Sequence, residues 1–170
     1  FQVNKGYGDA IILGIKNVKT KYFSIFNADG SFDPYELESM YNKIQNNSLD
    51  LLLASRYIKN ASSEDDTIIT LIGNKIFSLI GKIFFKLPIS DILYTYVMGN
   101  TQKVLNLNLT QKDFTLCVEL PIKAKRNGLN IADIAANEKS RIGGTKKVNA
   151  FKDGFLILLH MIKLFFKNEK

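Results

Sequence analysis

The stretch YFSIFNADGSFDPYEL (residues 22–37) decides how this chain is expected to fold. Its first five residues form an apolar run that is typical of a buried strand, and the run stops at Asn-Ala-Asp-Gly (residues 27–30), which favours a turn. Asp33 and Pro34 then have the spacing of a helix N-cap and a first-turn proline, and Glu36 completes a capping box. The stretch therefore predicts a strand, an acidic turn and a helix, in that order.

The alternation of helix and strand continues on both sides of this stretch. Residues 6–18 (GYGDAIILGIKNV) have helical apolar spacing, and residues 37–44 place four apolar side chains on one helix face. Residues 51–54 (LLLA) form a short continuous apolar run, which is typical of a strand buried on both faces. The order helix, strand, helix, strand predicts an α/β fold, mainly a parallel sheet flanked by helices.

The rest of the chain is predicted from apolar periodicity and turn residues. The expected elements are a loop over residues 57–67, helices over 68–87 and 113–126, an apolar segment over 131–136 and a last helix from about Asp153. Pro121 is expected to kink or split the second of these helices. No boundary divides the chain, so we assign residues 1–150 to one domain and residues 151–170 to an amphipathic helix.

The composition indicates a globular domain without covalent or zinc cross-links. The chain has 170 residues, of which 46% are hydrophobic and 23% charged. Its one cysteine, Cys117, cannot form an internal disulfide, and no second Cys or paired His is present for a zinc site. A reducing compartment is therefore expected. No uninterrupted apolar run reaches the roughly 18 residues of a membrane-spanning helix, so contact with a membrane surface is expected at most.

The net charge of +7 is concentrated near the end of the sequence. Residues 138–170 contain eight Lys or Arg against three Asp or Glu. Such a basic end favours a phosphate-bearing partner, and a solvated basic face is an equally good interpretation of the charge alone. Nucleic acid is disfavoured as that partner, because aromatic residues are not interleaved with the basic residues of the last segment.

Polar side chains at the ends of two predicted strands are the first candidates for a binding site. In a parallel sheet, ligands bind beyond the carboxyl ends of the strands, where Asn27, Asp29 and Arg56 would lie. An acidic turn at this edge can hold a divalent metal that in turn holds a diphosphate, and Arg56 could pair with a phosphate oxygen. The plainer interpretation is that Asp29 and Gly30 form only a turn and Asp33 only a helix cap. These residues alone favour the plainer interpretation.

The order of several short motifs along the chain changes that balance. They are NKGYGDAIILG from Asn4, NADGSFDPYEL, DLLLASR ending at Arg56, then Asn74 and Asp91, and finally RIGGTKK over residues 141–147. Each motif is weak alone. The ordered set resembles the family 2 glycosyltransferases of the GT-A (nucleotide-diphospho-sugar transferase) fold, within the branch that includes dolichol- and polyprenyl-phosphate sugar transferases.

The resemblance implies a role for each matching residue. Asp29 corresponds to the second acid of the family's Asp-x-Asp metal turn, and Asn27 stands where the first acid usually is. A divalent metal, Mg or Mn, would therefore be held by Asp29, with the uncharged Asn27 oxygen as a weaker ligand. Asp91 would orient the acceptor as the catalytic residue. Arg56, Arg141 and Lys147 would bind the donor diphosphate or the acceptor phosphate, and Asn4 would contribute to binding of the nucleotide-sugar donor.

The chain also departs from the family pattern. Thr95 and Val97 stand in place of the Gly and Arg that often follow the family's equivalent of Asp91, and Lys146 replaces a Ser. Roughly the first two strand–helix units of the fold, which bind the base and ribose, have no counterpart. The chain is therefore expected to be the carboxyl-terminal part of such an enzyme, with a truncated, partial GT-A fold over residues 1–150 and an exposed apolar sheet edge.

The resemblance implies a transferase that uses a nucleotide-sugar donor and, as acceptor, a polyprenyl phosphate at the cytoplasmic face of the cell membrane. A phosphate acceptor is already ionised near neutral pH, so no strong general base is required. A domain that binds a nucleotide or a partner without transfer is the alternative. A membrane surface is thus the expected partner besides the two substrates.

The last predicted helix carries the membrane part of this interpretation. One face of residues 155–166 is apolar, and Lys152, Lys163 and Lys167 are placed to reach lipid headgroups. Core packing of the same apolar stripe is the alternative. His160 is expected at the interfacial edge of this helix, whereas Cys117 is expected to be a packed core thiol.

Overall fold

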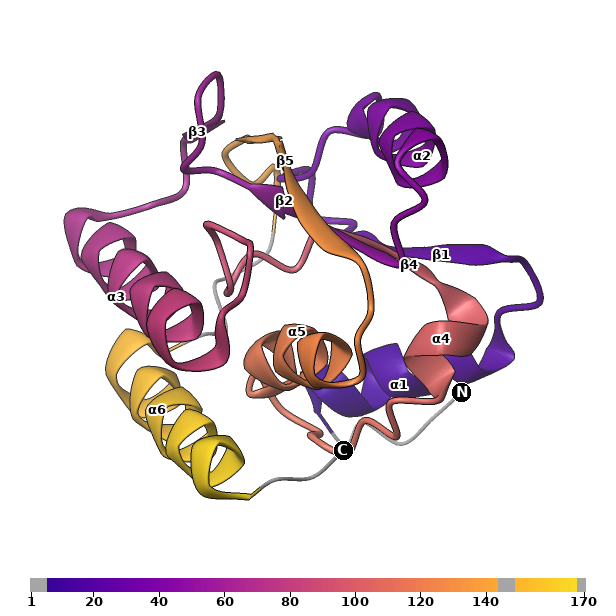
Figure 1. Cartoon of the computed structure of the whole chain (residues 1–170). Coiled ribbons are helices and arrows are strands. Elements are labelled where there is room, and N and C mark those ends of the chain that lie inside the picture. Colours follow the sequence, from indigo (N-terminus) through magenta and orange to yellow (C-terminus); the bar gives the residue numbers. More distant parts are fainter. Residues whose placement is uncertain (1–5, 144–148, 168–170) are drawn as a thin grey trace.

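The computed structural model describes residues 6–143 and 149–167. Every helix and strand predicted from the sequence is present, and α4, β3, β4 and β6 are additional (Figure 1). The elements are α1 Tyr7–Asn17, β1 Tyr22–Ile25, α2 Glu36–Asn46, β2 Leu51–Ser55, β3 Ser62–Ser63, α3 Ile68–Phe85, β4 Val97–Asn100, α4 Thr101–Leu105, α5 Leu116–Arg126, β5 Ile131–Ala135, β6 Asn137–Glu138 and α6 Ala150–Phe166.

Four strands form the central sheet in the order β1-β4-β2-β5. β2 and β5 are parallel, with Leu51 opposite Ile131, whereas β4 runs antiparallel to both β1 and β2. Three strands thus point in one direction, and the α/β class is confirmed. The antiparallel β4 was not predicted, because Gly99 weakens its strand pattern. Gly99 is required there, since a Cβ atom would lie 2.9 Å from the Phe23 ring.

Helices cover both faces of this sheet (Figure 1). α2 packs on one face, where Met40 and Ile44 join the inward side chains of β2 and β4 in one apolar core. The other face is covered mainly by α1, α4 and α5, with α3 and α6 at one end, and its core includes Val118, Ile122 and Ile157. β2 lies between the two cores and is buried throughout, as its continuous apolar run predicts.

The start of α2 differs from the prediction. Asp33 Oδ1 accepts a hydrogen bond from the Tyr35 backbone N–H at 3.0 Å, so Asp33 stabilises the turn that leads into the helix. The Glu36 carboxylate does not return to Asp33, because its Oε1 accepts the backbone N–H of Asn137 at 2.8 Å. The predicted capping box is therefore wrong: a long-range bond to β6 takes the carboxylate that the local motif would use.

Two further helix predictions need correction. Pro121 does not split α5, which continues through it as a single helix; eight of its eleven residues are buried, so packing on several sides offsets the hydrogen bond that proline cannot donate. α6 begins at Ala150, earlier than expected. Asn149 Oδ1 accepts the backbone N–H groups of Phe151 and Lys152 at 3.1 and 3.0 Å and acts as the N-cap.

α3 and α6 lie side by side at one end of the molecule (Figure 1). The Phe84 and Phe165 rings join them in an edge-to-face contact, with centroids 5.7 Å apart. α6 turns Ile157, His160 and Met161 toward the core. The prediction of an interfacial His160 is therefore wrong: its side chain is buried, and burial lowers its pKa.

Candidate active site

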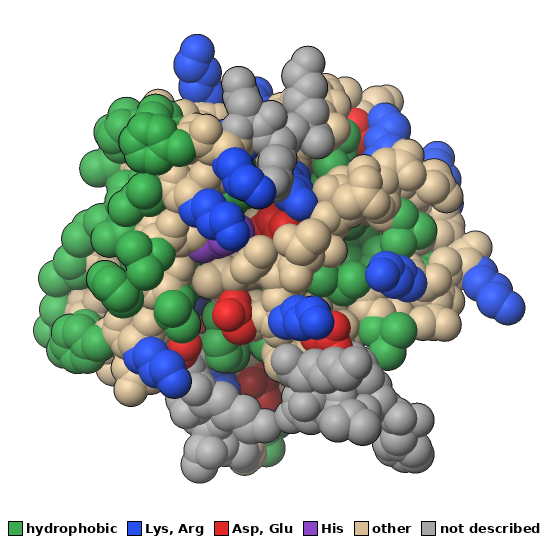
Figure 2. Space-filling view, turned by 90° about the horizontal axis from the view of Figure 1, so that it is seen from below, with side chains coloured by type: hydrophobic (Ala, Val, Ile, Leu, Met, Phe, Trp, Pro, Cys, Tyr) green, Lys and Arg blue, Asp and Glu red, His purple; other side chains and the backbone are tan. Residues whose placement is uncertain are grey.

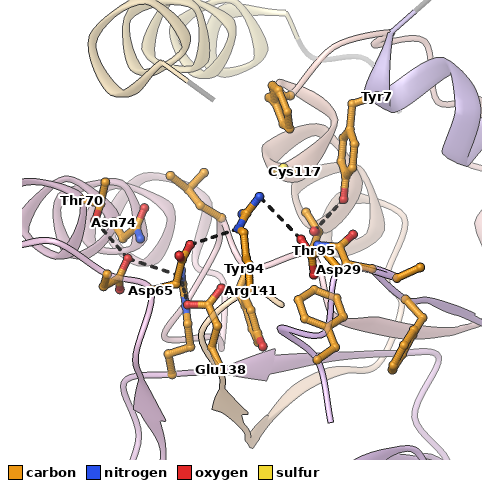
Figure 3. A pocket seen from close by; sticks show the side chains of 18 of the residues that line it. Tyr7, Asp29, Asp65, Thr70, Asn74, Tyr94, Thr95, Cys117, Glu138 and Arg141 are labelled. Carbon is orange, nitrogen blue, oxygen red and sulfur yellow. Dashed lines mark hydrogen bonds and ion pairs between the residues drawn. The ribbon is translucent and has the colours of Figure 1, made fainter. Parts of the chain in front are cut away.

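A pocket of about 480 Å³ opens beyond the carboxyl ends of β1 and β2. The turn after β1, the starts of α1, α3 and α5, the segment after β6 and Ile157 of α6 form its wall (Figure 3). Asn27, Asp29, Arg56 and Arg141 all line it, although they are far apart in the sequence. Four of the seven predicted site residues thus meet in one pocket. The rule that ligands bind at the carboxyl edge of such a sheet predicted this location for Asn27, Asp29 and Arg56, whereas Arg141 was expected from the family resemblance.

The acidic turn is fixed by its own hydrogen bonds and by the segment that carries Arg141. Asp29 Oδ1 accepts the backbone N–H of Ser31 at 3.1 Å and its hydroxyl at 2.6 Å. The Ile142 N–H donates to the Asp29 carbonyl oxygen at 2.9 Å. Gly30 has a positive φ of 85°, and a Cβ atom there would lie 2.6 Å from the Ile142 side chain. Only glycine suits this close approach.

Arg141 lies between two carboxylates in the pocket (Figure 3). Its Nη1 is 3.5 Å from Asp29 Oδ2, and its Nε is 3.4 Å from Asp65 Oδ2. Burial acts to raise the pKa of Asp29, but the hydrogen bonds from Ser31 and the charge of Arg141 outweigh it, and the pKa is lowered. Asp29 is therefore an ionised carboxylate that already faces a cation.

The residues of the acidic turn fit a divalent metal that a substrate helps to bind. Mg²⁺ is commonly held by one or two carboxylates together with substrate phosphates and water. Asp29 offers a carboxylate and Asn27 an amide oxygen to the same pocket. Within residues 6–143 and 149–167, no group of three or more His, Cys, Asp or Glu could hold a metal ion alone. The metal role of Asp29 and Asn27 stays a prediction, and it requires a diphosphate as a further ligand of the metal.

Arg56 is enclosed by carboxylates and aromatic rings. Its Nε and Nη2 donate to the two carboxylate oxygens of Asp91 at 2.7 and 3.0 Å, and its Nη1 donates to Glu138 Oε2 at 3.1 Å. Asp66 Oδ1 lies 3.5 Å from the same Nη1, and the Tyr94 ring centroid lies 4.6 Å from the guanidinium carbon. Burial disfavours the charge, but Asp91 and Glu138 outweigh it and raise the pKa of Arg56.

This network gives Arg56 and Asp91 a positioning role in the structure. Asp91 is completely buried and is absent from the described residues that line the pocket. It also accepts the Arg56 backbone N–H at 3.3 Å, so it fixes the end of β2. The catalytic role predicted for Asp91 would require the pocket wall to open. Phosphate binding by Arg56 would require a carboxylate to release it, and both roles stay predictions.

Several pocket residues were not identified from the sequence. Tyr7 stacks on Phe114 with ring centroids 4.8 Å apart and donates to Thr95 Oγ1 at 2.6 Å. Asp65 and Glu138 complete the acidic wall. Glu138 follows a predicted apolar segment and precedes the RIGGTKK motif, which is the signal that could have found it. Tyr7 lies within the NKGYGDAIILG motif, but its partners Phe114 and Thr95 are distant in the sequence, so the motif alone does not predict their contact.

The remaining predicted residues divide into two groups. Asn74 lines the pocket and donates to the Tyr57 hydroxyl at 2.8 Å, and Cys117 lines it with a thiol whose pKa burial raises to about 12. A thiol with so high a pKa is a weak nucleophile near neutral pH. Asn4, predicted to bind the donor, and Lys147, predicted to bind a phosphate group, lie outside the described residues.

The sheet, its helices and the pocket at the carboxyl edge define an α/β protein of the GT-A class. The fold is similar to glucosyl-3-phosphoglycerate synthase from Mycobacterium tuberculosis in complex with Mn²⁺, uridine-diphosphate and phosphoglyceric acid, with a TM-score of 0.72 and 9% identity over 98% of this chain and 56% of that chain. The complex of that synthase with uridine-diphosphate gives 0.70 and 10%, over 97% and 57%. At these identities the likeness concerns the fold alone.

The sequence profile of glycosyl transferase family 2 matches residues 1–105, and the chain belongs to this family. It is 30% identical to the UDP-N-acetylglucosamine–dolichyl-phosphate N-acetylglucosaminyltransferase of Methanococcus voltae, over 92% of this chain and 66% of the relative. An uncharacterized protein of Methanocaldococcus jannaschii is 24% identical over 94% and 70%. The chain thus spans about two thirds of the length of these curated relatives. The predicted family and fold are confirmed.

Proposed function

We propose that this chain is the part of a sugar transferase that moves a sugar from a nucleotide-sugar donor to a polyprenyl phosphate. The observation that carries the proposal is the meeting of Asn27, Asp29 and Arg141 in one pocket beside an exposed apolar surface. The Asp29 carboxylate can bind a metal that holds a diphosphate, and the Arg141 guanidinium can bind a phosphate. Both groups therefore suit a donor and an acceptor that each carry phosphate. The Methanococcus voltae relative is named for a dolichyl-phosphate acceptor, which supports a lipid phosphate here.

Different groups in the pocket would have different roles in such a transfer. A divalent metal, Mg²⁺ or Mn²⁺, would neutralise charge on the leaving diphosphate. Arg141 can pair with a phosphate oxygen once it leaves Asp29 or Asp65. A phosphate acceptor has a second pKa of about 6 and is ionised near neutral pH, so no strong general base is required. This agrees with a pocket in which Asp29, Asp65, Asp66 and Glu138 each already contact a cation.

α6 exposes the apolar face that the sequence predicts for an interfacial helix. Its exposed large apolar residues are Phe151, Phe155, Leu156, Leu158, Leu159, Ile162, Phe165 and Phe166. The neighbouring α3 exposes Ile68, Ile69, Ile72, Ile76, Leu79, Ile83 and Phe84. We call these fifteen residues the α3–α6 surface; Figure 2 shows apolar side chains gathered along this side of the molecule. Continuous apolar patches of this kind mark interaction sites.

The α3–α6 surface suits a membrane interface. Among the described helices, α3 alone is long and apolar enough to cross a membrane, and only 11% of its residues are buried. It packs along α6, and Thr70 and Asn74 near its start line the pocket, which favours an orientation along the membrane surface. Exposed Lys152, Lys163 and Lys167 on α6 and at its end would contact anionic headgroups. The protein would then be cytoplasmic and peripheral on the inner face of the cytoplasmic membrane.

The test of the proposed function is transfer itself. The protein at its full natural length is incubated with Mn²⁺, labelled nucleotide sugars and a short polyprenyl phosphate, and the lipid fraction is counted. We expect sugar in the lipid product and a sharp loss in Arg141→Ala and Lys147→Ala. Lys139→Ala is the matched control, because Lys139 is close in sequence but pairs with Asp33 outside the pocket.

Two results would contradict the proposed function. The first is undiminished transfer in both Arg141→Ala and Lys147→Ala. The second is a strong preference for a soluble carbohydrate acceptor without binding to liposomes, which would identify a soluble glycosyltransferase. Either result would rule out a lipid phosphate as the acceptor bound in the pocket.

A second candidate function is binding of a nucleotide or a partner without transfer. Asn27 favours it, because this residue brings no charge to the metal turn. The enclosure of Arg56 by three carboxylates favours it as well. Saturable binding of UDP with Mn²⁺ in a calorimeter, together with no transfer to any acceptor tested, would select this candidate.

A further inference from the structure

A groove of about 190 Å³ lies between α3 and α6, and every described residue that lines it is apolar. α3 contributes Ile80, Phe84 and Phe85, and α6 contributes Leu158, Met161, Ile162, Phe165 and Phe166. An apolar cavity of about 150 Å³ is enough to bind benzene. The groove therefore has room for a hydrocarbon segment of similar size.

The groove and the active-site pocket are built on the same two helices. On α6, Ile157 lines the pocket and the next residue, Leu158, lines the groove. On α3, Asn74 lines the pocket and Ile80 lines the groove. At 1.5 Å per residue these two α3 positions are about 9 Å apart along the helix. A chain that leaves the pocket along α3 and α6 would reach the groove within a few isoprenoid units.

Aromatic rings define one end of the groove. The Phe165 ring contacts those of Phe84, Phe85 and Phe166, with centroids 5.7, 6.1 and 5.4 Å apart. These rings come from both helices, so the groove is a feature of the helix pair and not of α6 alone. Phe166 is 81% exposed at its rim. Burial of this apolar rim by an occupant would be favourable.

We propose that this groove binds the isoprenoid chain of the lipid-phosphate acceptor close to its phosphate, an inference that rests on the proposed function. The apolar lining selects a hydrocarbon occupant. The exposed apolar residues on both helices give the chain a continuous path from the membrane. The groove volume of about 190 Å³ is smaller than one turn of a partner helix, whose diameter with side chains is about 10–12 Å. Exposed Lys163 on α6 and Lys167 at its end match the negative charge of an anionic lipid surface from which the chain would enter.

Acceptor chain length provides the first test. In the unsubstituted protein we expect kcat/KM to rise about tenfold or more from geranyl to geranylgeranyl phosphate, because the longer chain buries methylene groups in the groove. Ile162→Trp fills the groove without removing apolar surface and should abolish this gain. Leu159→Trp is the matched control, because both residues are 46% exposed on α6 and Leu159 does not line the groove. This control should keep the gain.

A second readout does not depend on activity. The sequence has no tryptophan, so an introduced indole is the only one in the protein. Phe166→Trp places it at the groove rim, and Leu159→Trp places it elsewhere on the same helix. Each variant is titrated with monomeric geranylgeranyl phosphate, without nucleotide sugar, and its fluorescence is compared with that of the unsubstituted protein. We expect a saturable shift to shorter wavelength in Phe166→Trp and no shift in Leu159→Trp.

The outcomes separate the groove from the proposed function. Transfer that is independent of chain length and unaffected by Ile162→Trp would refute isoprenoid binding in the groove, but it would not contradict the proposed function. No transfer to any polyprenyl phosphate, with the Phe166→Trp titration intact, would support the groove and refute the function. A response to phosphatidylglycerol vesicles but not to monomeric geranylgeranyl phosphate would overturn the proposal in favour of membrane acyl chains. Self-association that Ile162→Trp abolishes, without a ligand response, would assign the groove to a second copy.

Discussion

Asn27 brings an amide oxygen to a turn where a carboxylate would bring a charge. We predict that Asn27→Asp increases Mn²⁺ affinity in the presence of UDP about tenfold, since a second anionic ligand would replace a neutral one. Asp29→Ala should abolish binding. Because the pKa of Asp29 is lowered below its ordinary 3.8, the carboxylate stays ionised through the mildly acidic range, and binding is lost only as pH falls through the lowered pKa.

Calorimetry or the electron paramagnetic resonance of Mn²⁺ measures this affinity. Asp33→Asn is the control, because Asp33 pairs with Lys139 and is absent from the described lining of the pocket. Equal Mn²⁺ binding by Asp29→Ala and the unsubstituted protein would remove Asp29 from the metal site. An unchanged affinity in Asn27→Asp would show that position 27 does not contribute a ligand.

Asp91 is the buried partner that holds the Arg56 guanidinium at the pocket wall. We predict that Asp91→Asn lowers the free energy of unfolding by about 3–5 kcal/mol, because removal of one partner leaves a buried charge incompletely paired. Denaturant unfolding measures the loss. A normal unfolding midpoint combined with a large fall in kcat would contradict the positioning role and favour the catalytic role that the family resemblance implies.

At the scale of elements, Arg126 ties α5 to the ends of α3 and α6. Its Nη2 and Nη1 donate to the carbonyl oxygens of Leu164 and Lys167 at 2.5 and 2.9 Å, and its guanidinium carbon lies 5.7 Å from the Phe85 ring centroid. These bonds satisfy carbonyl groups at the C-terminus of α6, which otherwise lack partners within the helix. Arg126 therefore holds together the helix pair that forms the α3–α6 surface.

We predict that Arg126→Gln lowers the free energy of unfolding by about 1–2 kcal/mol and speeds amide hydrogen exchange in the last turns of α6. Lys125→Gln removes the same charge from the adjacent, exposed position and should change little. Denaturant unfolding and hydrogen exchange followed by mass spectrometry provide the two measurements. Equal effects of the two substitutions would indicate a general charge effect instead of a cap on α6.

At the scale of the whole molecule, charge and apolar surface combine on the α3–α6 side. We predict that the protein sediments with anionic liposomes at low salt and less at high salt. Lys163→Glu with Lys167→Glu should weaken this binding at least thirty-fold, because each basic residue near an anionic surface contributes about 1 kcal/mol. The matched control is Lys16→Glu with Lys19→Glu, which makes the same charge change at the exposed end of α1.

A circular dichroism spectrum should show that both double variants remain folded. Equal weakening by both pairs would mean that net charge alone drives the attachment. Retention of liposome binding by the α6 pair would place the membrane contact elsewhere. Only a selective effect at α6 supports a surface that faces the membrane.

Local sequence patterns predicted most elements, because their residues carry the signal within one or two turns. The strand at β2 follows from a continuous apolar run, and α1 follows from helical spacing. The antiparallel β4 was missed, because Gly99 has no strand preference of its own. A glycine lies there because the Phe23 ring of the neighbouring strand leaves no room for a side chain. The Glu36 capping box failed for a related reason: Asn137, 101 residues away in the sequence, competes with the local bond.

The sequence by itself determined the α/β class, the family and the turn that carries Asn27 and Asp29, because these depend on short-range order along the chain. Only the tertiary structure decided which charges meet. Arg141 reaches Asp29 through the fixed contact of two loops, whereas Arg56 turns to Asp91 and Glu138. The sequence could not distinguish these arginines, because a guanidinium pairs with phosphate or carboxylate according to which lies nearest in space. The α3–α6 groove likewise exists only where two helices meet.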